Sequence, residues 1–238
     1  SYSAIAHLAE DIVPFVGMAN GLRQRGFSAP QIYEAELSDG LLIIEDLGSE
    51  PVVSGDPPAP IEDRYAAAVD ALIALHSLEL PGSIPVAPHV GHSLPPYDID
   101  AYLIELGLLL DWYLPWRGIT VTDEVRADYV ALWTDALQIA LEAQLTWVLR
   151  DFHSPNLIWL PERQDIARVG LLDFQDAMMG PTAYDLASLL QDARVDVPEL
   201  MEVSLLGHYV TKRRETDPYF EPAEFLGRSI SHRIGDVD

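Results

Sequence analysis

Three oxygen-bearing side chains, Asp151, Asn156 and Asp173, each stand beside a short apolar run. Two of these runs flank the segment Pro-Glu-Arg-Gln at 161–164, and this pattern predicts a β-hairpin. Because a hairpin brings its two open ends together, we expect the three side chains to converge. Two carboxylates and an amide oxygen would form a hard-oxygen site, which suits Mg²⁺ with waters and substrate phosphates completing its shell. The apolar runs cover residues 147–149, 157–160 and 169–172.

These residue types point to phosphoryl transfer, which needs a positioned hydroxyl, metal ions that bridge the phosphates, and charge compensation. Asp151 could orient or deprotonate a substrate hydroxyl, an effect typically worth about 10²–10⁴-fold in rate. Asn156 and Asp173 offer a neutral and a charged oxygen to a cation, and Arg150 could hold a phosphate or pair with a nearby Asp. Taken singly, an Asp after a strand is usually a turn residue. The D-x₄-N spacing, followed by a hairpin and Asp-Phe, favours the metal site.

The composition excludes several classes of protein. The 238 residues carry a net charge of −24, which argues against a nucleic-acid partner and against an anionic membrane surface. No stretch approaches the ~18 uninterrupted apolar residues that a membrane span needs. The chain has no Cys, which excludes disulfides and zinc–thiolate sites and fits a reducing, cytoplasmic location. The charge favours a solvated acidic surface, with a cleft that attracts Mg²⁺ or a cationic substrate as the alternative.

The chain divides around a segment rich in Pro, Gly and Ser at 49–60, which we predict to be a linker. Residues 1–48 read as a small part with a helix and a hairpin, and residues 61–238 as a large, mainly helical part with one embedded hairpin. The sequence therefore predicts an α+β fold of two unequal parts.

The elements inside these parts follow from apolar periodicity and from turn residues. Ser38-Asp39-Gly40 is a turn signal, and it predicts a hairpin with strands at 31–37 and 41–47. The stretch 81–97 is rich in Pro and reads as a loop. The predicted helices cover 3–25, 61–79, 98–114, 122–144, 183–193, 198–215 and 222–232.

Other polar side chains have weaker claims to a site. Glu105 and Trp112 are seven residues apart on a predicted helix and could line a sugar pocket, although a buried Trp with a peripheral Glu is the simpler interpretation. His153 could orient the loop around Asp151 or touch substrate. Asp176 could contact substrate or a second cation. His76 lies on an apolar helix stripe and is predicted to be a core residue.

The central motifs resemble those of the aminoglycoside phosphotransferase/choline kinase-like family. Residues 149–156, LRDFHSPN, are similar to the family's catalytic loop H-G-D-x-H-x-x-N, and residues 172–177, LDFQDA, to its metal-binding segment. Residues 180–187, GPTAYDLA, match its G-x-x-x-x-D-L-A element. The sequence of this stretch, together with E-L-x₅-W-Y at 105–113, looks most like that of the anomeric kinases of N-acetylmuramate and N-acetylglucosamine.

This resemblance implies a protein-kinase-like two-lobe fold and transfer of the ATP γ-phosphoryl group to a small-molecule hydroxyl, most specifically the anomeric hydroxyl of an amino sugar in cell-wall recycling. By resemblance, Asp151 is the catalytic base, Asn156 and Asp173 are Mg²⁺ ligands, and Asp185 is a structural support. ATP is the co-substrate. The resemblance also implies a nucleotide hinge whose backbone would meet adenine, formed by Glu45, Asp46 and Leu47.

The sequence departs from the family pattern in two ways. Leu149 and Arg150 stand where the wider family has His and Gly. The glycine-rich loop and the phosphate-binding Lys are not found upstream, since the only Lys is Lys212. We therefore expect an incomplete N-terminal lobe. An aminoglycoside-type kinase is an alternative within the enzyme class, and an inactive pseudokinase or binding module is the alternative outside it.

Overall fold

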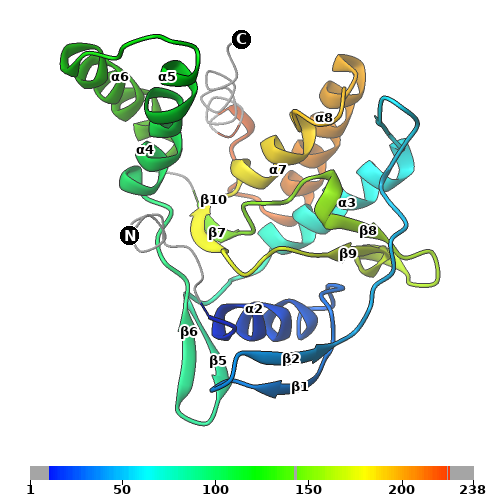
Figure 1. Ribbon diagram of the computed structural model, residues 1–238. Helices are drawn as coiled ribbons and strands as arrows, with labels where there is room; N and C mark the ends of the chain where they lie inside the picture. Colours follow the sequence, from blue (N-terminus) through cyan, green and yellow to red (C-terminus); the bar gives the residue numbers. More distant parts are fainter. Residues whose placement is uncertain (1–10, 142–143, 224, 226–238) are drawn as a thin grey trace.

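The computed structural model describes residues 11–141, 144–223 and 225, with strands and helices mixed along the chain (Figure 1). The longer helices are α2 (Val13–Arg23), α3 (Glu62–His76), α4 (Ile99–Leu108), α6 (Asp123–Leu141), α7 (Ala183–Leu190) and α8 (Glu199–Thr216). The strands are β1 (Ile32–Glu36), β2 (Leu41–Ile44), β3 (Val53–Ser54), β4 (Ala59–Pro60), β5 (Ser83–Ala87), β6 (Val90–Ser93), β7 (Leu145–Val148), β8 (Leu157–Trp159), β9 (Val169–Leu171) and β10 (Met178–Pro181).

Within these described residues the strands pair as two-stranded antiparallel ribbons. Four ribbons join strands that are neighbours in sequence, and the fifth joins β7 to β10 across the β8–β9 hairpin. In Figure 1, α2 with the β1–β2 and β5–β6 ribbons forms the lower part, and α3, α7 and α8 form the upper right. Helices α4 and α6 form a separate group at the upper left. The predicted α+β class is confirmed.

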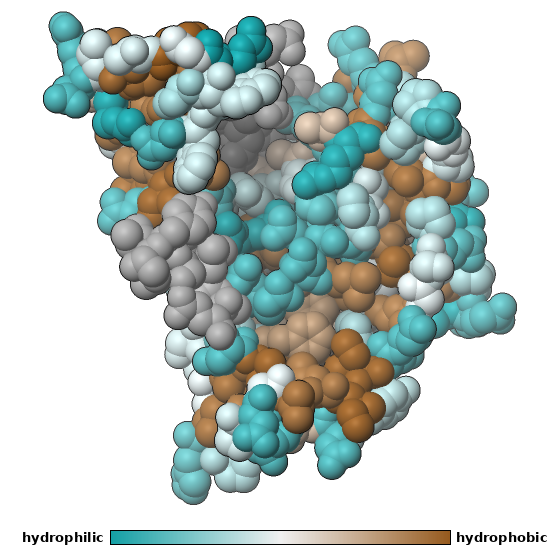
Figure 2. Space-filling view, in the orientation of Figure 1, coloured by the Kyte–Doolittle hydropathy of each residue, from teal (hydrophilic) through white to brown (hydrophobic). Residues whose placement is uncertain are grey.

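The hairpin predicted around Ser38-Asp39-Gly40 is present as β1–β2, with Glu36 opposite Leu41. Gly40 has φ 69°, a left-handed conformation that glycine adopts without steric cost. The ribbon leaves several apolar side chains on the surface, and Figure 2 shows apolar side chains gathered over this lower part of the molecule. The exposed residues there include Tyr33, Leu41, Ile43 and Ile44.

Two segments that we expected to lack regular structure contain short ribbons. In the predicted linker at 49–60, β3 pairs with β4, and the backbone N–H of Trp159 in β8 donates to the carbonyl of Glu50 at 2.7 Å. In the predicted loop at 81–97, β5 pairs with β6. Proline is tolerated in such ribbons because each strand has an open edge, where a missing N–H costs no ladder hydrogen bond. The proline content of these two segments therefore did not exclude short strands, as we had expected it to.

The helix predicted over 98–114 is interrupted. Helix α4 begins after Asp98, whose side chain accepts from the backbone N–H of Ala101 at 3.1 Å. A π-helical turn, Leu109–Tyr113, and the short helix α5, Leu114–Trp116, follow it. A π turn closes hydrogen bonds over five residues, so side chains seven apart no longer share a face as they do in an α-helix.

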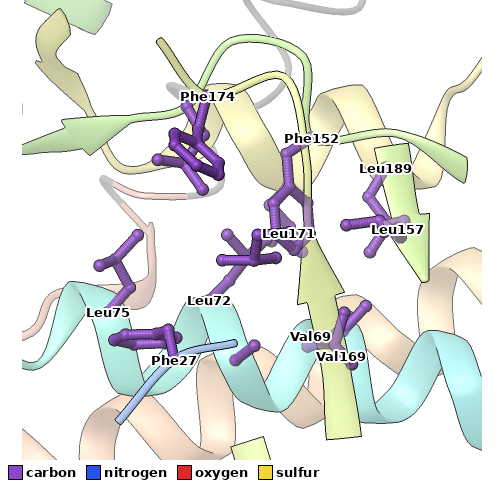
Figure 3. Close-up of a cluster of buried hydrophobic side chains, with 14 of the residues drawn as sticks. Phe27, Val69, Leu72, Leu75, Phe152, Leu157, Val169, Leu171, Phe174 and Leu189 are labelled. Atoms are coloured by element: carbon purple, nitrogen blue, oxygen red, sulfur yellow. The ribbon is translucent and has the colours of Figure 1, made fainter. Parts of the chain in front are cut away.

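The core is built around α3. Tyr65, Val69, Leu72 and His76 recur along one side of this helix and are all buried. Figure 3 shows Val69, Leu72 and other apolar side chains of α3 meeting those of the β8–β9 hairpin. His76 is a core residue, as expected, and its Nδ1 lies 2.7 Å from the Tyr209 hydroxyl. The β8–β9 hairpin, which carries the predicted site, is therefore anchored on α3.

Candidate active site

The hairpin brings the three predicted oxygen ligands together. Leu157 of β8 is opposite Leu171 of β9, so Asn156 and Asp173 lie at the same open end. The Asn156 side-chain amide donates to the backbone carbonyl of Asp151 at 3.0 Å and lies 3.4 Å from Asp173 Oδ2. The three residues therefore lie close together at this end of the hairpin, with the amide nitrogen of Asn156 facing both aspartates, while their role as metal ligands stays a prediction.

Each acidic residue is followed by a phenylalanine that anchors it. Phe152 and Phe174 are both buried, and Figure 3 shows their rings among the apolar side chains near Leu171. The Phe174 ring also stacks on Phe15 of α2, with centroids 5.1 Å apart. Asp151 itself is only partly buried and Asp173 is exposed, so the buried rings leave both preceding carboxylates toward solvent. The Asp-Phe pairs thus place two carboxylates at the edge of the core.

Asp185, near the start of α7, holds the backbone just before Asp151. The N–H groups of Leu149 and Arg150 donate to its two carboxylate oxygens at 2.7 and 3.0 Å. Its side chain is buried, and burial raises the pKa of the Asp185 carboxyl to about 7. This geometry supports the structural role predicted for Asp185, since it ties the loop to α7 through two hydrogen bonds.

The carboxylates of the site crowd one another. Burial and the neighbouring Asp173 carboxylate raise the pKa of Asp151, and the charges of His153 and Arg150 act in the opposite direction. His153 Nε2 lies 3.5 Å from Asp151 Oδ1. Asp176 is partly buried nearby, and its charge also raises the pKa of Asp151. Among the described residues no three His, Asp or Glu side chains are grouped as a metal site, so a divalent cation here stays a prediction that rests on the crowding of these carboxylates.

Glu105 and Arg150 meet, whereas Trp112 lies elsewhere. The Arg150 guanidinium forms an ion pair with the Glu105 carboxylate of α4, and both side chains are largely buried. Tyr97 donates to the same carboxylate at 2.6 Å. Trp112, in the π turn, is 73% exposed, so it takes no part in the buried network around Glu105. The simpler interpretation, a buried Trp with a peripheral Glu, is therefore wrong, and a sugar pocket lined by Glu105 and Trp112 stays a prediction.

The predicted hinge lies directly after β2. The backbone N–H of Glu45 donates to the carbonyl of Gln31 at 2.7 Å, and its carboxylate forms ion pairs with Arg23 of α2 and Arg163 of the β8–β9 turn. Asp46 accepts from the N–H two residues on, at 2.8 Å, and the Leu47 side chain is buried. The hinge side chains are thus engaged in packing and ion pairs.

A model of the phosphotransferase enzyme family matches residues 3–219. The chain belongs to this family. The match covers both the predicted hinge segment and the residues Asp151, Asn156 and Asp173.

Two relatives resemble this chain along most of its length, at about a third sequence identity. An N-acetylmuramate/N-acetylglucosamine kinase of Caulobacter vibrioides is 37% identical over 224 residues, which is 91% of this chain and 60% of that protein. One of the same name from Pseudomonas aeruginosa is 33% identical over 204 residues, covering 85% and 56%. The chain therefore spans 60% or less of the length of these relatives.

Solved structures of phosphotransferases have the same fold at low identity. An ethanolamine kinase of Plasmodium vivax matches with a TM-score of 0.61 and 14% identity, over 93% of this chain and 64% of that one. The ADP-bound aminoglycoside phosphotransferase APH(2'')-Ib matches with a TM-score of 0.54 and 18% identity, over 94% and 76%. The predicted protein-kinase-like fold is confirmed.

Sequence reasoning missed a second set of contacts between α7 and the loop that carries Asp151. Asp192, just after α7, accepts from the backbone N–H and the hydroxyl of Ser154 at 3.1 and 2.7 Å. The Ser188 hydroxyl lies 3.4 Å from the carbonyl of Arg150. Both residues also line a cavity of about 250 Å³ beside α7, with Tyr184 and others. The spacing of 184, 187, 188 and 191 on one helix face was the available signal.

Proposed function

We propose that this chain carries the phosphoryl-transfer site of an ATP-dependent kinase that acts on the anomeric hydroxyl of N-acetylmuramate or N-acetylglucosamine. The observation that carries the proposal is the convergence of Asp151, Asn156 and Asp173 at the end of the hairpin. The substrate rests on the relatives from Caulobacter and Pseudomonas, whose names state those two sugars.

In this mechanism Asp151 is the base. The sugar hydroxyl oxygen forms a bond to the γ-phosphorus, the bond from that phosphorus to the ADP oxygen breaks, and the hydroxyl proton passes to the Asp151 carboxylate. A raised pKa suits a group that must accept a proton near neutral pH. Asn156 and Asp173 would hold Mg²⁺, which supplies charge compensation at the phosphates.

The nucleotide and the acceptor would approach the loop from different elements. We assign adenine to the backbone of Glu45, Asp46 and Leu47, as the family resemblance implies. For the acceptor we favour the cavity beside α7, because Ser188 and Asp192 in its wall also bind the backbone on either side of Asp151. His153 and Asp176 lie near enough to Asp151 to affect its charge and could contact the sugar.

Location and organisation complete the proposal. We propose a cytoplasmic enzyme, because the reaction needs ATP, with residues 1–48 as part of an N-terminal lobe, 49–60 as the connection and 61–238 as the C-terminal lobe. The net charge of −24 supports a small-molecule partner over nucleic acid. Among the helices that the structure describes, none is both long and apolar enough to cross a membrane.

The test is an ADP-release assay on the protein in its full natural length, with ³¹P NMR of the product. N-acetylmuramate and N-acetylglucosamine should be phosphorylated, and their 1-O-methyl glycosides should not, because the anomeric oxygen is blocked. Turnover of kanamycin but of neither sugar would instead identify an aminoglycoside-type kinase. Binding of Mg-ATP without turnover of any acceptor would identify a binding module.

A further inference from the structure

Arg150 has an unusual backbone conformation for its residue type. Its φ is 69°, in the left-handed region that Cβ-bearing residues disfavour. Asp173 and Asp165 also have positive φ, but Asp tolerates this region because its short polar side chain can bond to nearby backbone. Arg has no such local compensation. The conformation of residue 150 must therefore be imposed by contacts from other elements.

Those contacts are visible on three sides of the residue. Its N–H donates to Asp185 at 3.0 Å, and its carbonyl lies 3.4 Å from the Ser188 hydroxyl. Its guanidinium pairs with Glu105 of α4. The Arg150 side chain is 11% exposed and that of Glu105 is 28% exposed, so the pair is shielded from most of the solvent. α4 is thereby connected directly to the residue before Asp151.

The Glu105 carboxylate is itself held from two sides. Tyr97 donates to its Oε2 at 2.6 Å, and the Tyr184 hydroxyl of α7 lies 3.5 Å from the same atom. Tyr97 also lies beside the guanidinium, with 5.9 Å between the Arg150 Cζ and the ring centroid. Packed tyrosines and a buried ion pair leave the carboxylate little freedom, so it can serve as a rigid attachment point.

The unpaired atoms of Arg150 argue against a direct contact with substrate. Its Nε and Nη1 are buried and have no hydrogen-bond partner among the described residues. Buried nitrogens cannot reach a phosphate or a sugar unless the side chain leaves its place. The guanidinium of Arg150 therefore serves as the partner of Glu105. It does not bind a phosphate, which was one of the two roles that the sequence allowed.

We propose that the Glu105–Arg150 ion pair is a positioning device, which holds residue 150 in the left-handed conformation and so sets the place of the Asp151 carboxylate. A glycine at position 150 could adopt the left-handed conformation without such a tether, whereas Arg150 needs the ion pair to hold it there. The catalytic part of the proposal rests on the proposed kinase function, whereas the conformational part does not.

The test uses four variants of the full natural protein: Glu105→Gln, Arg150→Gly, Arg150→Ala and the double variant Glu105→Gln/Arg150→Gly. Hydrogen exchange of the peptide over 149–156, without substrate, reports opening of the loop, and steady-state kinetics give kcat and the acceptor KM. Glu105→Gln should speed exchange and lower kcat about tenfold or more, with KM changed less than threefold. The double variant should recover both quantities to within about threefold of Arg150→Gly, because glycine needs no tether and the unpaired cation is gone.

Arg150→Ala separates conformation from charge. It removes the same ion pair as Arg150→Gly but keeps a Cβ, so its kcat should be about 5–30-fold lower than that of Arg150→Gly, from the cost of a left-handed residue. This comparison carries the test by itself if Glu105→Gln proves unstable. Asp111→Asn is the matched control, since Asp111 pairs with Arg126 at 2.6 Å in the same helical group but is 52% exposed.

The outcomes separate the explanations. A double variant no better than Glu105→Gln, or equal activity of Arg150→Ala and Arg150→Gly, overturns the proposal. A tenfold rise in acceptor KM for Arg150→Gly with kcat retained would assign Arg150 to substrate binding instead. Because exchange is measured without substrate, restored protection in the double variant supports the conformational role even if neither sugar is phosphorylated, and that result would count against the proposed function alone.

Discussion

Replacing Asp151 with Asn should separate activity from stability. The substitution removes the proposed base while keeping the size of the side chain. We expect kcat to fall about 10²–10⁴-fold, which corresponds to about 3–5 kcal/mol of transition-state stabilisation. Binding of Mg-ATP should change little, because Asn156 and Asp173 are retained as the proposed ligands.

The same substitution should not destabilise the fold in the absence of Mg²⁺. Burial and the Asp173 carboxylate raise the pKa of Asp151 in the folded state, so ionising Asp151 at neutral pH weakens folding, and a neutral Asn removes that effect. The Asp151 side chain is 44% exposed, so solvent screens the repulsion strongly. We therefore expect a gain of only about 0.2–1 kcal/mol in the free energy of unfolding.

The measurements are kcat from ADP release, the Kd of Mg-ATP from calorimetry, and urea unfolding with EDTA at pH 7.5. Asp165→Asn is the matched control, because Asp165 lies in the turn at the other end of the same hairpin and has a φ of 50° that Asn tolerates. Activity within tenfold of wild type would refute the role of Asp151 as base. A loss of more than about 1 kcal/mol in stability would refute the account of carboxylate crowding.

Three further outcomes follow from particular contacts. Gly180→Ala should cost about 1–3 kcal/mol in urea unfolding, because the added Cβ would lie 2.8 Å from the Cβ of Tyr97, whereas Gly207→Ala in α8 meets nothing within 4 Å and should stabilise by about 0.5–1 kcal/mol. Burial lowers the pKa of His76 to about 3, below an unfolded value of about 6.5. The neutral buried His76 therefore contributes to stability above pH 6.5, and this contribution is lost as the pH falls toward 3. In the His76→Gln variant, the free energy of unfolding should depend less on pH between about 7.5 and 5. Asp173→Asn should reduce the rise in melting temperature that Mg-ATP produces, and an unchanged rise would remove it from the metal ligands.

Local sequence patterns could predict the part of the site that depends only on the geometry of the β8–β9 hairpin. Apolar runs and the polar turn between them determine the register of β8 and β9, and that register alone brings Asn156 and Asp173 to one end. The Asp-Phe pairs add to this, because Phe152 and Phe174 could be recognised as core residues from their type. Distances between Asp151 and its neighbours could not be predicted, because they depend on a loop without strand structure.

The parts that sequence reasoning missed depend on contacts between distant segments or on departures from regular helix. The pairing of β7 with β10 encloses an entire hairpin, and periodicity within either strand does not reveal its partner. The π turn at Leu109–Tyr113 contains no Gly or Pro that would mark it in the sequence, and it interrupts the helix predicted over 98–114. Family resemblance supplied the role of Asp185, which spacing alone left as an ordinary residue at a helix start.

The loop that carries Asp151 has little structure of its own, so its geometry comes from carboxylates outside it. Asp185 is 36 residues from Leu149, Asp192 is 38 from Ser154, and Glu105 is 45 from Arg150. Burying a carboxylate is unfavourable unless donors satisfy it, and here the loop's own N–H, hydroxyl and guanidinium groups are among the donors, beside Tyr97 at Glu105 and Arg194 at Asp192. Each of these acids thus loses one or more donors when the loop leaves its place. The folding of α4 and α7 and the positioning of Asp151 are therefore coupled, which is why changes at Glu105 should be felt at the reacting carboxylate.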